Sequence, residues 1–479
     1  MKYTHKSEWL PALPLDTLQP LLVRYALRSF PAISPDTTAE GYDKEFFLLH
    51  ARSLLTTCCA LVEPSTEILH TASYVAFSVG DFKADKMQTA ASIACSAAAE
   101  VLFLRNREHA KQVAFNAIEA LPFTDFGAQA QWDLAEFSDN PDPKALFLHS
   151  LWTIWLQLSD KQQQIAFPKE YQEFTWPRFW REWYQGFLDG KPLDWELQRR
   201  VALIDDAIWK AGPEAVAKEI ERIQAEMLDK KLPMAEHIEV NPDTGKFHAI
   251  PIPVENPTTL SALLSQIEDE LEDCLGGHNG LAERSGTVKK LNRVLTKYKD
   301  DPQNAELTLT RVAGSLRSQL HETKELTDNE DNLALLDAVE EGVRGIRANH
   351  PEVAKNREQL AQQAIHALTP EDKVLLQQAL PVLAEISEPD LADDFATDIP
   401  ELINDALLPL PAGAPPLPGS DATTRVFSRV SKMAIAAEQG AKILDSNEIK
   451  TVRLAHLGYT ALELFYSLVQ IGLRILGVL

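Results

Sequence analysis

The last part of the chain, from Arg453 to Leu479, has a pattern that few folds can accommodate. Its polar side chains recur at alternating spacings of three and four residues, so on a helix they form one narrow stripe. The stripe consists of Arg453, His456, Thr460, Glu463, Ser467, Gln470 and Arg474. Nearly every other residue is apolar or small. The pattern predicts a helix about 40 Å long, enough to span a bilayer, with one line of groups that needs water or polar partners.

Three interpretations of this helix are open. It could span or insert into a membrane, with Glu463 and Arg474 facing a water-filled lumen or partner helices. It could lie along a membrane surface, although such helices usually carry a broader charged face. It could instead be buried in the protein or in an oligomer, with the polar stripe outward.

Charge is distributed unevenly around this tail. The formal net charge of −24 argues against a nucleic-acid partner, because nucleic-acid binders normally show a basic face. Residues 421–479 nevertheless carry +2, whereas residues 1–420 carry −26. The four cysteines suggest no disulfide framework, and residues 1–22 lack the apolar core of a signal peptide. We therefore predict a cytoplasmic protein, attached to the inner membrane if the C-terminal helix inserts.

The period of the apolar residues predicts a mostly α protein with a multi-helix array, a helical bundle, one small β-hairpin and a hydrophobic C-terminal helix. Turn residues Asn241 to Gly245 lie between two alternating stretches and predict the hairpin. The expected segments are an alanine-rich helical array at 1–140, a Trp-rich helical segment at 141–257 with the hairpin at 237–252, a charged bundle at 258–408, a Pro-rich linker at 409–420, and a basic segment with the hydrophobic helix at 421–479.

Aromatic residues concentrate in the middle of the chain, where seven of the nine tryptophans lie between residues 145 and 213. Trp176, Trp180 and Trp183 share one helical face. We expect this face to be core, because aromatic side chains dominate core burial. An aromatic pocket for a base or sugar and an interaction surface for a partner are the alternatives.

Three blocks in this region occur together. They are Trp180–Tyr184 with Asp189–Pro192, Ile208–Trp209 with Gly212–Pro213, and His237–Pro242 with Thr244–Phe247. Together they resemble a group of uncharacterised bacterial proteins with an alanine-rich helical front half and a Trp-rich middle. The resemblance covers roughly residues 60–260 and implies no activity, cofactor or functional residue.

No catalytic motif stands out. Gly245-Lys246 lacks the upstream glycine of a phosphate-binding loop, and no serine has the flanking glycines of a hydrolase elbow. Cys274 and His278 are four residues apart, but two glycines separate them and no second metal-binding pair is near. His278, in its glycine-rich loop, is the best single candidate for a polar site. We predict no metal and no cofactor, and the lack of a catalytic motif favours a non-enzymatic protein without deciding the question.

A charge contrast precedes the tail. Residues 385–405 contain eight acids and no Lys or Arg, and a Pro-rich spacer separates them from the basic residues of 425–453. One hypothesis is that the acids hold the basic segment and restrain the hydrophobic helix, through exposed ion pairs that salt would weaken. The alternative is a solvated acidic surface and an unrelated basic helix.

The predicted function is therefore that of a non-enzymatic helical protein whose C-terminal helix, residues 454–479, associates with membrane lipid, as an oligomeric membrane-acting effector. The alternative is a soluble scaffold or interaction protein whose C-terminal helix is buried in a homo-oligomer interface. An enzyme of unrecognised type is a third possibility.

Overall fold

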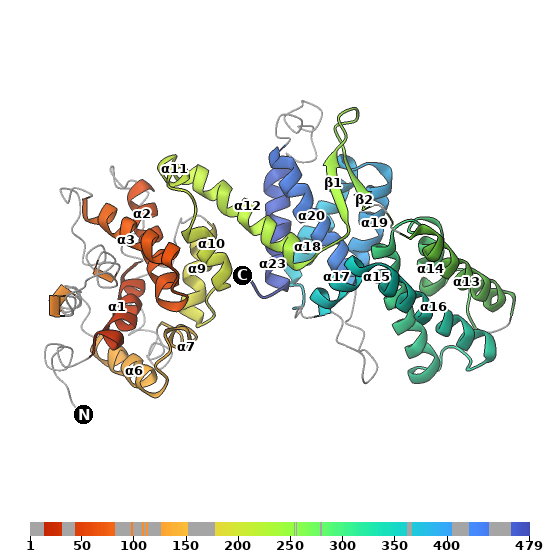
Figure 1. Ribbon diagram of the computed structural model, residues 1–479, viewed down its shortest axis with the longest axis horizontal. Helices are drawn as coiled ribbons and strands as arrows, with labels where there is room; N and C mark the ends of the chain where they lie inside the picture. Colours follow the sequence, from red (N-terminus) through yellow and green to blue (C-terminus); the bar gives the residue numbers. More distant parts are fainter. Residues whose placement is uncertain are drawn as a thin grey trace. The chain divides into compact units, whose positions relative to one another are not determined.

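Over the residues that it describes, the computed structural model is helical apart from one small antiparallel sheet, as the sequence predicted (Figure 1). It forms two compact units, Met1–Ile223 with Val478–Leu479, and Gln224–Gly477. The division falls inside one helix, α12 (Pro213–Lys231), and at none of the predicted segment boundaries. The structure describes residues 14–30, 44–81, 97–98, 108–109, 112–113, 126–151, 178–252, 254, 256–277, 280–361, 366–404, 421–439 and 461–479.

Short helices build the first unit. They are α1 (Leu15–Ser29), α2 (Lys44–Val62), α3 (Thr66–Asp81), α6 (Phe126–Asp139), α7 (Pro143–Phe147), α9 (Arg178–Asp189), α10 (Trp195–Ala202), α11 (Asp206–Lys210) and the start of α12. Helices α2 and α3 pack against each other, and α10 packs against both. Asp194 and Asp205 accept backbone N–H bonds as the N-caps of α10 and α11, so these short helices have satisfied ends.

Aromatic rings fill the core of the first unit. On α9, Trp180 and Trp183 are 2% and 0% exposed. The Trp183 indole packs edge-on against Phe30 with ring centres 5.8 Å apart, and its Nε1 donates to Gln198 Oε1 at 2.9 Å. Their burial makes these two residues core, as expected, and leaves them no exposed face for a partner. Trp176 lies outside the described residues.

A tight contact fixes the segment that follows α7. Gly190 has φ of +67°, and a Cβ there would lie 2.6 Å from Leu148 O, so the position requires glycine. Arg24 of α1 donates through Nη2 to Ser150 O at 2.8 Å and lies 3.2 Å from Asp133 of α6. The Asp-Gly block of the Trp-rich region is therefore a close-packing site.

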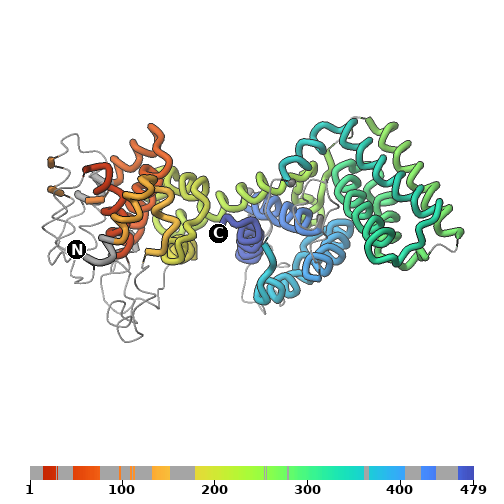
Figure 2. The backbone as a smooth tube through the Cα atoms, turned by 90° about the horizontal axis from the view of Figure 1, so that it is seen from below, coloured from red at the N-terminus to blue at the C-terminus, as the bar shows by residue number. Residues whose placement is uncertain are grey.

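The second unit combines a hairpin with longer helices. Its elements are β1 (Glu236–Val240), β2 (Phe247–Pro251), α13 (Pro257–Gly276), α14 (Gly286–Thr296), α15 (Pro302–Arg317), a π-helical turn (Ser318–Glu322), α16 (Glu330–Asn349), α17 (Pro351–Ala361), α18 (Pro370–Ile386), α19 (Pro389–Asn404), α20 (Asp421–Gln439) and α23 (Ala461–Ile475). Helices α13 to α16 pack together, and α19, α20 and the hairpin pack together. Both views show these two groups (Figures 1 and 2).

One apolar core belongs to α13–α17. Its buried residues run from Leu260 to Val353 and include Leu309 and Leu316 of α15. On α16, Leu333 is 37% exposed, while Leu335 is fully buried. Leu333 lies in the first turn of α16 and points outward.

The hairpin has the predicted place. Val240 pairs with Phe247, and Asp243 N donates to Asn241 Oδ1 at 2.9 Å within the turn. Phe247 O accepts from Glu388 N at 2.8 Å, which attaches β2 to the start of α19. Two strands alone are marginally stable, so this attachment to the helical body supports them.

Helix α23 is part of the second unit. Residues 464–473 are all buried, and the Phe465 ring packs edge-on against Phe247 with centres 5.6 Å apart. A Cβ on Gly472 would lie 2.8 Å from Leu228 and 3.0 Å from Phe427, so α23 approaches α12 and α20 closely. The helix ends at Ile475, not at Leu479 as predicted.

The early end of α23 has a backbone cause. Gly477 has φ of +64°, the left-handed conformation that terminates helices, and its N–H donates to Arg474 O at 3.0 Å. The predicted helix residues before Ala461 lie outside the described residues.

We predict that Trp183→Ala lowers the free energy of unfolding of the first unit by roughly 3–5 kcal/mol, because it leaves a large cavity and removes the donor to Gln198 Oε1. Urea denaturation followed by fluorescence measures this. Tyr74, 41% exposed on α3, is the matched control, and Tyr74→Ala should cost far less. Equal effects of the two substitutions would contradict the core assignment.

Candidate functional site

Two rows of opposite charge face each other in the second unit. The acids of α19 recur at spacings of four and three residues, and the bases of α14 recur at three and four. Antiparallel packing therefore brings each acid opposite one base. The pairs are Lys290–Glu401 at 3.1 Å, Arg293–Asp398 at 3.7 Å and Lys297–Asp394 at 2.8 Å.

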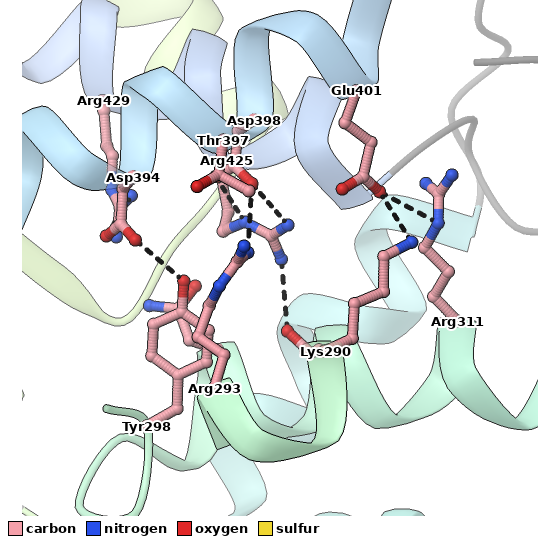
Figure 3. A network of polar contacts seen from close by, with 12 residues as sticks. Lys290, Arg293, Tyr298, Arg311, Asp394, Thr397, Asp398, Glu401, Arg425 and Arg429 are labelled. Atoms are coloured by element: carbon pink, nitrogen blue, oxygen red, sulfur yellow. Dashed lines mark hydrogen bonds and ion pairs between the residues drawn. The ribbon is translucent and has the colours of Figure 1, made fainter. Parts of the chain in front are cut away.

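Helix α20 supplies a second set of bases to the same acids (Figure 3). Arg425 binds Asp398 in a bidentate manner, with Nε–Oδ2 at 2.8 Å and Nη2–Oδ1 at 3.0 Å. Arg429 binds Asp394 through Nη1 at 2.9 Å. It also forms a bidentate pair with Glu236 of β1, at 2.8 and 3.0 Å. Bidentate pairs fix orientation as well as distance.

The last acid of the row has its second base on α15. Arg311 Nε lies 3.1 Å from Glu401 Oε1. Arg425 Nη1 also donates to Thr308 Oγ1 on α15, at 3.4 Å. Each of the three α19 carboxylates is thus shared between two cations from two different helices. We call Asp394, Asp398 and Glu401 with these partners the carboxylate row.

Burial divides the row into an inner and an outer half. The side chains of Asp398, Arg425 and Arg429 are 1%, 3% and 3% exposed. On α14, Lys290 and Lys297 are 25% and 29% exposed. Removing one member of a dry pair leaves its partner charged and desolvated, whereas a wet pair contributes little. The contacts of α20 therefore dominate the energetics.

The ionised states of Asp394 and Glu236 are stabilised by neighbouring cations. Burial raises the pKa of Asp394, but the charges of Arg429 and Lys297 outweigh it and bring that pKa below its usual value. The pKa of Glu236 is lowered against burial by Arg429 in the same way. The pKa of Arg429 is raised well above its usual value, because Glu236 and Asp394 together outweigh its burial.

One buried acid beside the row behaves in the opposite way. Asp301, the N-cap of α15, has its pKa raised to about 6, by burial and then by the nearby charge of Glu236. Asp301 Oδ1 accepts from Asn304 N at 3.0 Å and Oδ2 accepts from Asn304 Nδ2 at 2.7 Å. These bonds are from neutral donors, so they compensate only part of the desolvation.

The predicted polar stripe of the tail is divided by the fold. Glu463 is exposed, as expected. Ser467 and Gln470 are 7% and 5% exposed, so the stripe does not face outward along its length. Arg474 Nη2 pairs with Asp372 of α18 at 2.6 Å. His456 and Thr460 lie outside the described residues, as does His278.

The acidic run holds part of the basic segment, as one hypothesis proposed. Asp394 and Asp398 contact α20, whereas Asp390 and Asp393 are exposed. The expected sensitivity to salt needs correction, because these pairs are dry and mobile ions screen them poorly. Sequence reasoning missed the bases of α14, although their spacing, complementary to that of the acids, was a usable signal.

In the part of the chain that the structure describes, no three His, Cys, Asp or Glu side chains are grouped so that they could hold a metal ion. Within the same ranges, no helix is both long and apolar enough to cross a membrane.

Comparison with known proteins identifies no relative. No protein-family model matches the chain, and no curated protein or solved structure is significantly similar to it. The resemblance of the Trp-rich blocks therefore stays an expectation from the sequence, and the site is interpreted from its own chemistry.

We predict that Asp394→Asn lowers the free energy of unfolding of the second unit by about 3–5 kcal/mol, because Arg429 and Lys297 lose a buried counter-charge. Chemical denaturation with a helix-sensitive signal measures the loss. Asp393→Asn, on the adjacent but exposed residue, should change stability by less than about 0.5 kcal/mol. A similar loss in both variants would contradict the assigned burial.

We predict that Asp301 makes the second unit more stable as the pH falls from 7.5 to 5. Its folded pKa of about 6 exceeds the unfolded value near 4, so the folded state binds the proton first. Over this pH range the gain is about 1.4 kcal/mol, because the remaining effect of the pKa difference appears only below pH 5, and Asp301→Asn should remove it. Urea unfolding of both proteins at several pH values tests this. A pH dependence unchanged by the substitution would show that Asp301 is not the group.

Proposed function

We propose that this chain is a non-enzymatic helical interaction protein whose C-terminal helix α23 is an internal part of its second unit. The observation that carries the proposal is the burial of the ten consecutive residues 464–473 by other parts of the same chain. In this arrangement the apolar face of α23 has its partners already, on α12, α20 and β2.

Both ends of the helix add polar anchors. Tyr466 OH donates to Glu438 on α20, and Arg474 pairs with Asp372 on α18. The N–H of His366 donates to Ile475 O at 2.7 Å, satisfying a carbonyl of the last turn. Such specific contacts favour the interpretation that α23 is a permanent part of the fold over one in which it is covered without defined contacts.

The charged site also supports a structural role. A general acid or base at neutral pH needs a pKa near 7 and access to substrate. Asp394 and Glu401 have pKa values below their usual ones, since their cationic partners outweigh the effect of burial. These carboxylates are therefore suited to binding bases of the chain rather than to proton transfer.

A second candidate is the membrane-associated effector, in which residues 454–479 contact lipid, the protein is cytoplasmic at the inner membrane, and copies assemble. The specific observation that favours it is the composition of α23, whose buried residues include Leu464, Phe465, Leu468, Val469 and Ile471. Freed from the second unit, this surface would partition into a bilayer interface.

Flotation of the full chain with vesicles of phosphatidylethanolamine and phosphatidylglycerol separates the candidates. We expect the protein to remain in the unbound fraction, because α23 already buries its apolar face. A chain stopped at residue 460 should remain unbound too and should lose stability in the second unit. Flotation of the full chain but not of the shortened one would reject the proposal and favour the effector.

A further inference from the structure

The described residues of the second unit form two apolar regions, which the ion pairs of the carboxylate row connect. Among the described residues, the core of α13–α17 lies between Leu260 and Val353 and includes no residue of α18–α23. The apolar residues of α20, such as Phe427, instead contact α23. Helix α15, which belongs to the first region, contacts the carboxylate row through Arg311 and contacts Arg425 of α20 through Thr308. Apolar burial therefore does not couple α23 directly to the α13–α17 core.

Helix α20 contacts both the carboxylate row and α23. Residues 422–431 are all buried, and within them Arg425 and Arg429 project to the carboxylate row while Phe427 packs beside Gly472 of α23. The position of α20 is set by bidentate ion pairs, which have one favourable geometry. The surface of α20 against which α23 packs is therefore held in place by charges that α23 does not carry.

From this arrangement we infer that α20 and α23 open from the second unit together, as one segment, and that the carboxylate row is the latch that holds the segment shut. Opening exposes the apolar face of α23 while α13–α17 stay folded around their own core. The latch responds to loss of carboxylate charge far more than to salt, since its inner pairs are dry.

A second buried network holds α15, α16 and α17 together. Glu306 of α15 is 0% exposed and pairs with Arg347 of α16 and Arg357 of α17, at 2.6 and 2.9 Å. This second buried network ties α15 to α16 and α17 alone. Of these two networks, only the carboxylate row includes residues of α20, while α23 has an ion pair of its own between Arg474 and Asp372 of α18.

Native-state hydrogen exchange of the full chain, followed by mass spectrometry, tests the inference without any substitution. Peptides from α20 and α23 should share one opening equilibrium and one dependence on denaturant, and should exchange faster than peptides from α13 and α16. The inference is wrong if all four helices exchange through a single global opening, or if α20 and α23 open independently.

Substitutions identify the latch. Asp398→Asn should accelerate exchange in α20 and α23 together by a factor on the order of ten or more, with α13 and α16 unchanged. Asp393→Asn should change neither pair. Glu306→Gln, which neutralises an equally buried carboxylate, should accelerate α16 and α17 and leave α23 as in the parent. Acceleration of α20 without α23 by Asp398→Asn, or of α23 by Glu306→Gln, would overturn the latch.

These measurements are independent of flotation. The full chain can fail to bind vesicles and still show the shared opening of α20 and α23, or it can bind vesicles and lack that opening. Failure of the latch and failure of the proposed function are therefore distinguishable.

Discussion

The arginines of α20 need buried counter-charges, and the second unit is arranged to supply them. Arg425 and Arg429 are nearly inaccessible, and desolvated guanidinium groups are tolerated only beside carboxylates in good geometry. That requirement places α19 on one side of α20 and Glu236 of β1 on another. The hairpin, α19 and α20 are thus positioned by one set of contacts, and α23 packs against α20 and the hairpin.

Sharing each acid between two helices has a structural consequence. Helix α14 contacts the row from its wetter side, so the row stays partly neutralised when α20 moves. A purely apolar contact between α20 and its neighbours would expose a large apolar surface to water on opening. A contact made of ion pairs exposes groups that water solvates well, and its bidentate pairs fix one register between the helices while it is closed. The second unit can therefore combine a specific closed state with a local opening.

The first unit relies on a different principle. Its α9 core is made of interlocking rings, and the Trp209 ring lies 4.7 Å from the Arg52 guanidinium, which also pairs with Asp206 at 2.6 Å. Trp183, Gly190 and Trp209 belong to the blocks that resemble uncharacterised bacterial proteins. All three have structural roles in packing, so the first two blocks contribute to the packing of this unit.

The sequence by itself determined the features that depend on residues close together along the chain. The hairpin follows from its turn residues, and α12 from its apolar period with Pro213 in the first turn. Which acids are buried was decided by tertiary structure. Asp393 and Asp394 are adjacent and chemically identical, but only Asp394 faces bases about 100 residues earlier on α14 and 35 later on α20. The tail shows the same division: its spacing determined an amphipathic helix, but packing against α12, α20 and β2 decided that the apolar face is covered by the chain itself, because burial depends on partners distant in sequence.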